Sequence, residues 1–158
     1  MIEEALRRIE TTKTEKLHYL DLRGLNLEEI PKEILEIPWI QALSLSNNKL
    51  TDLSILNQLP NIHKLALTKN NISDISILET LPKLRFIFLG DNQVTDITPI
   101  IRHERLKKMV LNNNQITELP PLDHIPLLAY LDISMNPCEK PSFKQIQTMC
   151  PVLRIYKV

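Results

Sequence analysis

Apolar positions recur along the chain in a pattern that repeats about every 22 residues. The stretch LRFIFLGDNQVTDI, Leu84–Ile97, follows the pattern LxxLxLxxNxLxxL. Its Ile87 and Leu89 flank a single residue, which is the alternation of a strand with one buried face, and the chain then turns at Asn92. The six copies begin at Leu17, Ile40, Ile62, Leu84, Leu106 and Leu128. This period predicts a solenoid in which each coil adds one short parallel strand and buries its apolar face only against neighbouring coils.

Asparagine occupies the turn position in five of the six copies. These asparagines are Asn48, Asn70, Asn92, Asn114 and Asn136. A turn inside the stack buries backbone groups, and an amide side chain both donates and accepts hydrogen bonds. We therefore expect each asparagine to satisfy the backbone of its own coil and of the next coil. Leu25 replaces asparagine in the first copy, which we assign to a terminal coil beside a helical cap.

Both ends of the repeat array carry segments that predict caps. Residues 2–10 place apolar side chains at helical spacing, with two Glu–Arg pairs four residues apart on the polar face. These pairs are Glu3 with Arg7 and Glu4 with Arg8. Near the other end, Ser142 followed by Gln145 is a capping-box signal for a second helix. Residues 153–158 keep the strand spacing once more, so we expect a final edge strand there.

Composition and charge argue against several classes of function and location. The 19 basic and 19 acidic residues cancel, so no overall field favours nucleic acid or an anionic membrane. The N-terminus lacks the apolar run of a secretory signal, and no stretch approaches the length of a membrane span. We therefore expect a cytoplasmic protein, with secretion by a non-classical route left open. The two cysteines, Cys138 and Cys150, are expected to be reduced and packed in the C-terminal cap, with a disulfide between them as the alternative.

The residues between the fixed apolar positions point outward from the strands, because strand side chains alternate. Four of the aromatic residues fall at these positions, although folding does not require them there: Tyr19, Phe86, Phe88 and Tyr130. Exposed aromatics beside basic residues are typical of interface hot spots, whereas the alternative is a scatter of surface aromatics without a role. The candidate partner-binding residues are Lys64, Arg85, Phe86, Phe88, Lys107, Lys108, Val110, Tyr130 and Asp132.

Other candidate sites have simpler explanations. An acidic column follows each turn and would suit a cation or a basic peptide, but short acids there also accept hydrogen bonds from backbone amides. The column comprises Glu29, Asp52, Asp74, Asp96 and Glu118. His18 and His63 lie two strands apart, too far to share a metal without a third ligand, so we predict no metal site and no cofactor. No phosphate-cradling glycine loop, GxSxG or HExxH motif is present, and we predict no catalytic residue.

The repeats and their caps resemble the leucine-rich-repeat proteins from Leu17 onward. The phrases TDL, SDI, TDI and TEL at mostly 22-residue spacing are similar to the subclass of the phosphatase-1 regulatory subunit and the bacterial internalins. The first copy, LDLRGLNLEEIPKEILEI, is similar to the 23-residue repeats of bacterial and Roco-kinase proteins, and CPVLRIYKV resembles the C-terminal cap of the phosphatase regulator. The resemblance implies a curved stack with its parallel strands on the concave side and a role in holding another protein.

We therefore expect an α/β fold, a right-handed leucine-rich-repeat solenoid of six repeats and a terminal half repeat with helical caps at both ends. It forms a single domain, 1–158, divided into an N-terminal cap (1–16), the repeats (17–138) and a C-terminal cap (139–158). The function expected is that of a monomeric, non-enzymatic module that binds another protein, and neither nucleic acid nor membrane, on its concave face. The alternatives are a bacterial effector or signalling regulator and the regulatory repeat region of a larger multidomain enzyme.

Overall fold

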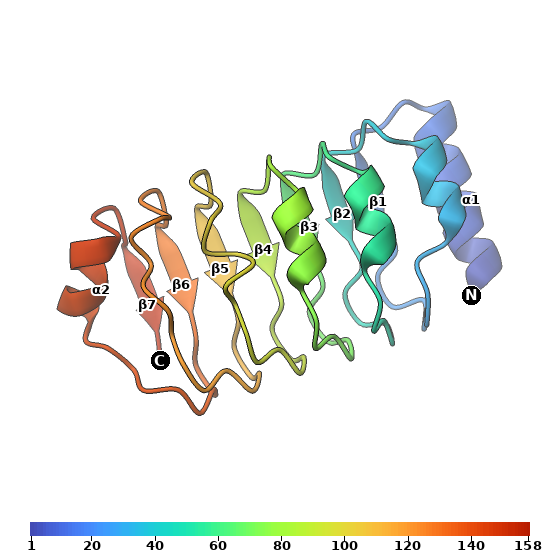
Figure 1. Cartoon of the computed structure of the whole chain (residues 1–158). Coiled ribbons are helices and arrows are strands. Elements are labelled where there is room, and N and C mark those ends of the chain that lie inside the picture. Colours follow the sequence, from blue (N-terminus) through green and yellow to red (C-terminus); the bar gives the residue numbers. More distant parts are fainter.

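Seven short parallel strands form one continuous sheet in the computed structural model, which describes all 158 residues (Figure 1). The strands follow one another in chain order, and each is paired in register with the next. They are β1 (Tyr19–Asp21), β2 (Ala42–Ser44), β3 (Lys64–Ala66), β4 (Phe86–Phe88), β5 (Lys108–Val110), β6 (Tyr130–Asp132) and β7 (Ile155–Lys157). The predicted solenoid is confirmed, including the final edge strand.

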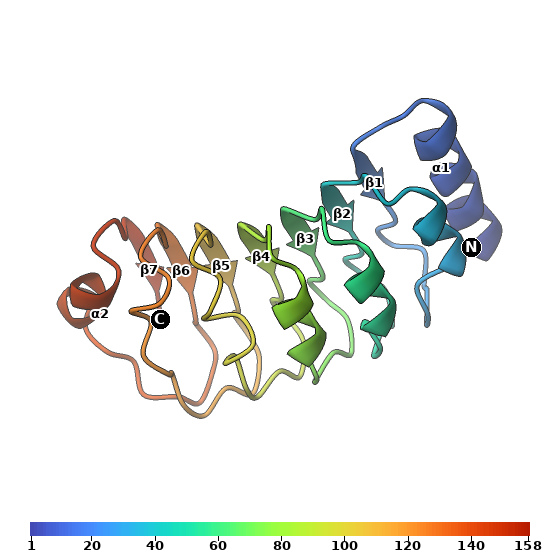
Figure 2. The same ribbon diagram turned by 45° about the horizontal axis from the view of Figure 1, so that its top comes forward.

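The chain returns from each strand to the next on the side opposite the sheet. In the first three coils this return includes a 3-10 helix: η1 (Lys32–Glu36), η2 (Ser54–Gln58) and η3 (Ser76–Thr80). The later coils return through turns instead, as Figure 2 shows. Between the sheet and the returns lies one continuous cluster of 43 buried apolar residues, because every coil directs its fixed apolar positions toward the same interior.

The asparagine column forms a ladder of buried hydrogen bonds. Asn92 accepts a bond from the Ile72 amide at 3.0 Å and donates to the carbonyls of Leu67 at 2.9 Å and Leu89 at 3.0 Å. The side chain thus satisfies its own coil and the preceding coil, so the expected bonds to the next coil were wrong. Bonding to the preceding coil explains why Leu25 can replace asparagine in the first copy, because the first coil has no preceding coil whose carbonyls need a donor. The Leu25 amide instead donates to Asn48.

The residue before each ladder asparagine adopts a left-handed backbone conformation. The five φ angles lie between 54° and 58°, at Asn47, Lys69, Asp91, Asn113 and Met135. Asparagine and aspartate tolerate this region better than other residues with a side chain. Lys69 and Met135 therefore carry strain that the repeated turn geometry imposes on them.

The two ends of the core are covered by helices. The N-terminal helix α1 spans Ile2–Thr14 and so runs four residues past its predicted end at residue 10. Tertiary contacts hold this extra turn: Thr12 is buried, and Lys13 forms an ion pair with Glu36 at 2.5 Å. The C-terminal helix α2 spans Phe143–Met149 and has the predicted capping box between Ser142 and Gln145. Neither helix is long and apolar enough to cross a membrane.

The ion pairing on α1 differs from the expected pattern. Glu4 accepts hydrogen bonds from both Arg7 at 2.8 Å and Arg8 at 2.7 Å, so Arg7 pairs with Glu4 rather than with Glu3. Hydrogen bonds from the two guanidinium groups lower the pKa of the Glu4 carboxyl to about 2. An offset of three residues serves as well as four, because both bring side chains to the same helix face.

Candidate functional site

The outward side chains of the strands form two straight rows on the exposed face of the sheet, here called the sheet face. The first row consists of Tyr19, Ala42, Lys64, Phe86, Lys108, Tyr130 and Ile155. The second row consists of Asp21, Ser44, Ala66, Phe88, Val110, Asp132 and Lys157. The residue between them in each of the first six strands is buried, so the variable positions of the repeat supply this face.

Lysines and aromatic rings alternate across the last five strands. The Lys64 ammonium lies 5.7 Å from the centre of the Phe88 ring. Lys108 lies 5.3 Å from the Phe88 ring and 4.0 Å from the Tyr130 ring, and Lys157 lies 5.6 Å from the Tyr130 ring. These five residues form what we call the lysine–aromatic ladder. Each contact lies within the range of a cation–π interaction, which fixes the direction of otherwise mobile lysine side chains.

Most of the expected site residues lie on or beside this ladder. Phe86 lies between Lys64 and Lys108 in the first row, and Val110 follows Phe88 in the second row. Phe86, Phe88, Val110 and Tyr130 are all half-buried, so their outer surfaces stay open to solvent. The strands thus bring together the aromatic residues that the repeat pattern leaves variable.

Three expected residues lie differently. Arg85 and Lys107 each precede their strand by one residue and flank the two rows. Arg85 is close enough to His63 to lower the pKa of that imidazole, although burial of the ring is the larger cause. Asp132 is only 7% exposed, and its carboxylate accepts bonds from the Ser134 amide at 3.1 Å and hydroxyl at 2.6 Å. This carboxylate is therefore engaged within its own turn.

Lys157 is a ladder residue that the sequence analysis missed. A hydrogen bond with Tyr130 raises the pKa of its ammonium group. The sequence could have placed Lys157 on this face, because residues 153–158 repeat the strand spacing and align Lys157 with Asp132. Lys157 was not among the predicted site residues because the last strand was assigned to the C-terminal cap.

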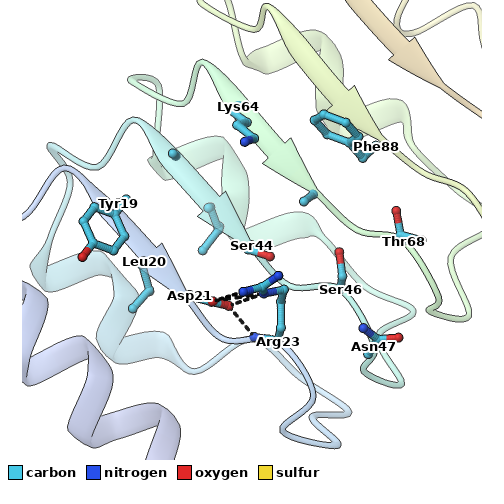
Figure 3. Close-up of a pocket in the computed structure, with 13 residues that line it drawn as sticks. Tyr19, Leu20, Asp21, Arg23, Ser44, Ser46, Asn47, Lys64, Thr68 and Phe88 are labelled. Atoms are coloured by element: carbon cyan, nitrogen blue, oxygen red, sulfur yellow. Dashed lines mark hydrogen bonds and ion pairs between the residues drawn. The ribbon is translucent and has the colours of Figure 1, made fainter. Parts of the chain in front are cut away.

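A shallow hollow lies on the sheet face over β1 to β4, with a volume of about 570 Å³. Its lining includes small side chains, at Ala42, Ser44 and Ala66. Tyr19 and Phe88 stand on opposite sides of the hollow, as Figure 3 shows. At one end of the hollow, Arg23 and Asp21 form an ion pair at 2.7 Å. The hollow was not predicted, although small residues at outward positions of adjacent repeats were a signal for it.

The three aspartates of the acidic column stabilise turns. The carboxylates of Asp52, Asp74 and Asp96 each accept a bond at 2.8 Å from the backbone amide two residues ahead. This geometry supports the turn explanation over a cation track. No group of three or more histidine, cysteine or acidic side chains is arranged to hold a metal ion.

The cysteines are buried free thiols, as expected, and do not form a disulfide. The Cys150 thiol lies 3.4 Å from the Leu122 carbonyl, to which it donates. Burial raises the pKa of this thiol to about 11. Cys150 therefore stays protonated near neutral pH and lacks the reactivity of a nucleophilic thiolate.

The fold and repeats agree with comparisons to known proteins. A family model described as leucine-rich repeats (two copies) matches residues 60–102, and no curated protein matches the chain. Three solved structures share the fold. An internalin of Listeria monocytogenes (InlF) is 20% identical, with a TM-score of 0.81, and the match covers 95% of this chain and 54% of the internalin. A leucine-rich-repeat protein of Leptospira interrogans is 28% identical, with a TM-score of 0.79, over 93% of this chain and 38% of that protein.

The third structure is the ectodomain of the Arabidopsis thaliana receptor kinase GASSHO1/SCHENGEN3. It is 25% identical, with a TM-score of 0.58, over 68% of this chain and 14% of the ectodomain. The chain thus spans about half of the internalin and smaller parts of the other two proteins. Repeat pattern, parallel sheet and structural likeness together make the chain a leucine-rich-repeat protein.

Proposed function

We propose that the protein is a non-enzymatic interaction module that holds another protein against its sheet face. The lysine–aromatic ladder carries the proposal, because the repeat needs apolar residues inside the coil and leaves the outward positions free. Half-buried aromatic rings held in place beside lysines give a rigid surface that loses little entropy on binding. Aromatic residues in such a setting are typical of binding hot spots.

Structures of other leucine-rich-repeat proteins support protein binding as the general function. The GASSHO1/SCHENGEN3 ectodomain was solved in complex with CASPARIAN STRIP INTEGRITY FACTOR 2. Our proposal extends protein binding to this chain and assigns it to Phe86, Phe88, Val110, Tyr130 and the lysines around them. The proposed module acts in the cytoplasm as a monomer. It serves alone as an effector or regulator, or as the repeat region of a larger enzyme.

Replacing Phe88 with aspartate tests the proposal. Phe88 touches two lysines of the ladder and also borders the hollow. The side chain lies outside the core, so we expect the circular dichroism and melting temperature of Phe88→Asp to stay close to those of the wild type. Loss of a central aromatic hot spot costs about 2 kcal/mol or more, so capture of partner from an extract of the producing cells falls at least about thirtyfold.

The matched control is Leu127→Asp. Leu127 is 45% exposed and lies in the loop before β6, outside both rows of the sheet face. This variant introduces the same charge in place of an apolar side chain, and we expect it to capture partner as the wild type does. Equal capture by Phe88→Asp and the wild type would refute the proposed function.

A further inference from the structure

Charge is unevenly distributed over the sheet face. From β3 to β7, the two rows and the position before each strand carry six cations and one carboxylate, that of Asp132. The cations are Lys64, Arg85, Lys107, Lys108, Arg154 and Lys157. The same positions of β1 and β2 carry one charged residue, Asp21, which pairs with Arg23. The part of the face over β3 to β7 is therefore basic and is called the basic half. The part over β1 and β2 has no net positive charge and is called the neutral half.

None of these six cations forms an ion pair within the chain, whereas several arginines and lysines near the N-terminus do. Lys64 and Lys108 lie over aromatic rings, and Lys157 lies over the Tyr130 ring and is hydrogen-bonded to the same residue. A ring contact leaves the ammonium hydrogens on its far side free to donate to a carboxylate. The basic half thus presents ordered donors without acceptors, and charge complementarity favours an acidic partner.

The hollow, which extends from the neutral half over β3 and β4, fits an apolar side chain. Ala42, Ser44 and Ala66 leave space in the hollow where the later strands carry larger side chains. Tyr19 and Phe88 border that space from two sides, and aromatic walls bury apolar groups well. Phe88 also belongs to the lysine–aromatic ladder, so the hollow and the basic half are continuous.

We infer that the partner presents an acidic polypeptide segment that carries one apolar anchor, a leucine-sized side chain. The anchor enters the hollow, and the carboxylates bind the ladder lysines. This inference rests on the proposed function, since it specifies the partner of the same face. Adjacent strands lie about 4.8 Å apart, so lysines on β3, β5 and β7 recur roughly every 10 Å. This spacing matches every third residue of a segment in the polyproline II conformation, whose side chains return to the same face about every 9 Å.

Nucleic acid fits this face less well. Proteins that bind single strands stack bases on open aromatic faces, whereas lysines lie over the rings of Phe88 and Tyr130. The two cations that line the hollow are Lys64 and Arg23, and Arg23 is already paired with Asp21. Phosphates would meet the cations, but the two rings nearest to those cations would not be open for the bases.

Fluorescence anisotropy with defined peptides tests the inference on the full chain. The acidic probe is an extended peptide with glutamate at every third position, serine between them, and a leucine at one end. It is made in both orientations, since the structure does not fix the direction of the segment. Companion probes replace each glutamate with glutamine, or the leucine with serine, and an oligothymidine of equal length represents nucleic acid.

We expect the acidic probe to bind at low salt and the glutamine probe to bind at least about tenfold more weakly. Changing Lys64, Lys108 and Lys157 to glutamate lowers the affinity for the acidic probe by a similar factor. The matched control changes three exposed lysines outside both rows, Lys32, Lys49 and Lys144, to glutamate. The control has the same net charge, so equal losses in the two variants would overturn the inference.

The anchor is tested by filling the hollow. Ala66→Phe removes the advantage of the leucine probe over the serine probe and leaves the affinity for the serine probe unchanged. Ser44→Val fills the same hollow with less bulk and serves as a second variant if Ala66→Phe unfolds at a lower temperature. A leucine advantage that survives both substitutions overturns the anchor assignment.

The remaining outcomes separate this inference from the proposed function. Equal binding of the glutamate and glutamine probes, or tighter binding of oligothymidine, overturns the acidic segment. If Phe88→Asp then still abolishes partner capture, the proposed function stands and only the inferred partner chemistry is wrong. If Phe88→Asp captures partner normally, the proposed function itself is wrong.

Discussion

His103 is the one imidazole in a column of otherwise apolar or thiol core side chains, and replacing it should stabilise the protein. The same position of the other coils holds Ile37, Leu59, Leu81, Ile125 and Cys150, each 0% exposed. The His103 ring is 9% exposed, and its buried Nε2 has no hydrogen-bond partner. A buried polar atom without a partner costs about 1–3 kcal/mol. His103→Leu, which restores the apolar column, should raise the free energy of unfolding by about that amount.

The same substitution should reduce the sensitivity of the protein to acid. Burial lowers the pKa of His103, although a backbone hydrogen bond with Leu78 and the charge of Glu79 oppose this. Arg102, Glu104 and Arg105 line the adjoining surface. Because the folded-state pKa lies below the unfolded value of about 6.5, only the unfolded chain gains a proton as the pH falls through 6.5. The stability is therefore complete above that pH and is lost as the pH falls toward the folded-state pKa.

Urea denaturation followed by circular dichroism at pH 7.5 and pH 5.5 measures both effects. We expect His103→Leu to be more stable than the wild type at both values, with the larger difference at pH 5.5. Burial and nearby cations also lower the pKa of His63, so part of the acid sensitivity remains in the variant. The control, His124→Gln, changes a histidine that is 69% exposed and should match the wild type. A His103→Leu variant that is less stable, or has an unchanged pH dependence, would refute this reasoning.

Three further predictions concern the asparagine ladder, the thiols and the C-terminal cap. Asn70→Asp keeps the shape but removes one donor from each of two buried carbonyls, which retain bonds from Asn48 and Asn92. Thermal unfolding should therefore show a loss of about 1–3 kcal/mol for the two hydrogen bonds, and unchanged stability would contradict the role of the asparagine ladder. Cys138 and Cys150 should resist iodoacetamide until denaturant is added, as mass spectrometry can follow, and rapid native labelling would contradict their burial. Ser142→Ala removes the capping-box acceptor and should cost about 1 kcal/mol, whereas unchanged stability would show that the cap is dispensable.

The repeat made most of the fold predictable. The fixed apolar positions recur every 22 residues with strand alternation, so Leu43, Leu65 and Ile87 could be assigned to one interior before any coordinates were known. The hydrogen-bond partners of the asparagines were harder to predict. The sequence of one coil shows that a buried amide is needed, but it does not show which neighbouring coil supplies its partners. The end of α1 was missed because contacts such as Lys13 with Glu36, distant in the sequence, hold its last turn.

The candidate site was predictable only in part. Alternation placed Phe86 and Phe88 on the outer face, and the structure has them there. The pairing of each ladder lysine with a ring depends on side-chain direction across strands, which the order of residues does not give. Asp132 was predicted to be a partner-binding residue, and its bond to Ser134 was not anticipated, because an acid followed two residues later by serine does not fix where the carboxylate points. The hollow was not predicted because it depends on the space that small residues on adjacent strands leave together.

Site-specific photocrosslinking at Phe88 tests the central claim most directly. A photoreactive phenylalanine analogue at this position keeps an aromatic ring at the junction of the hollow and the ladder. The account predicts a crosslink to one partner protein in producing cells, mapped by mass spectrometry to an acidic segment and lost in the Lys64, Lys108 and Lys157 charge-reversal variant. The same analogue at Leu127 should not yield that crosslink. Equal crosslinking from both positions, or none from Phe88 while Leu127 captures the partner, would contradict binding on the sheet face.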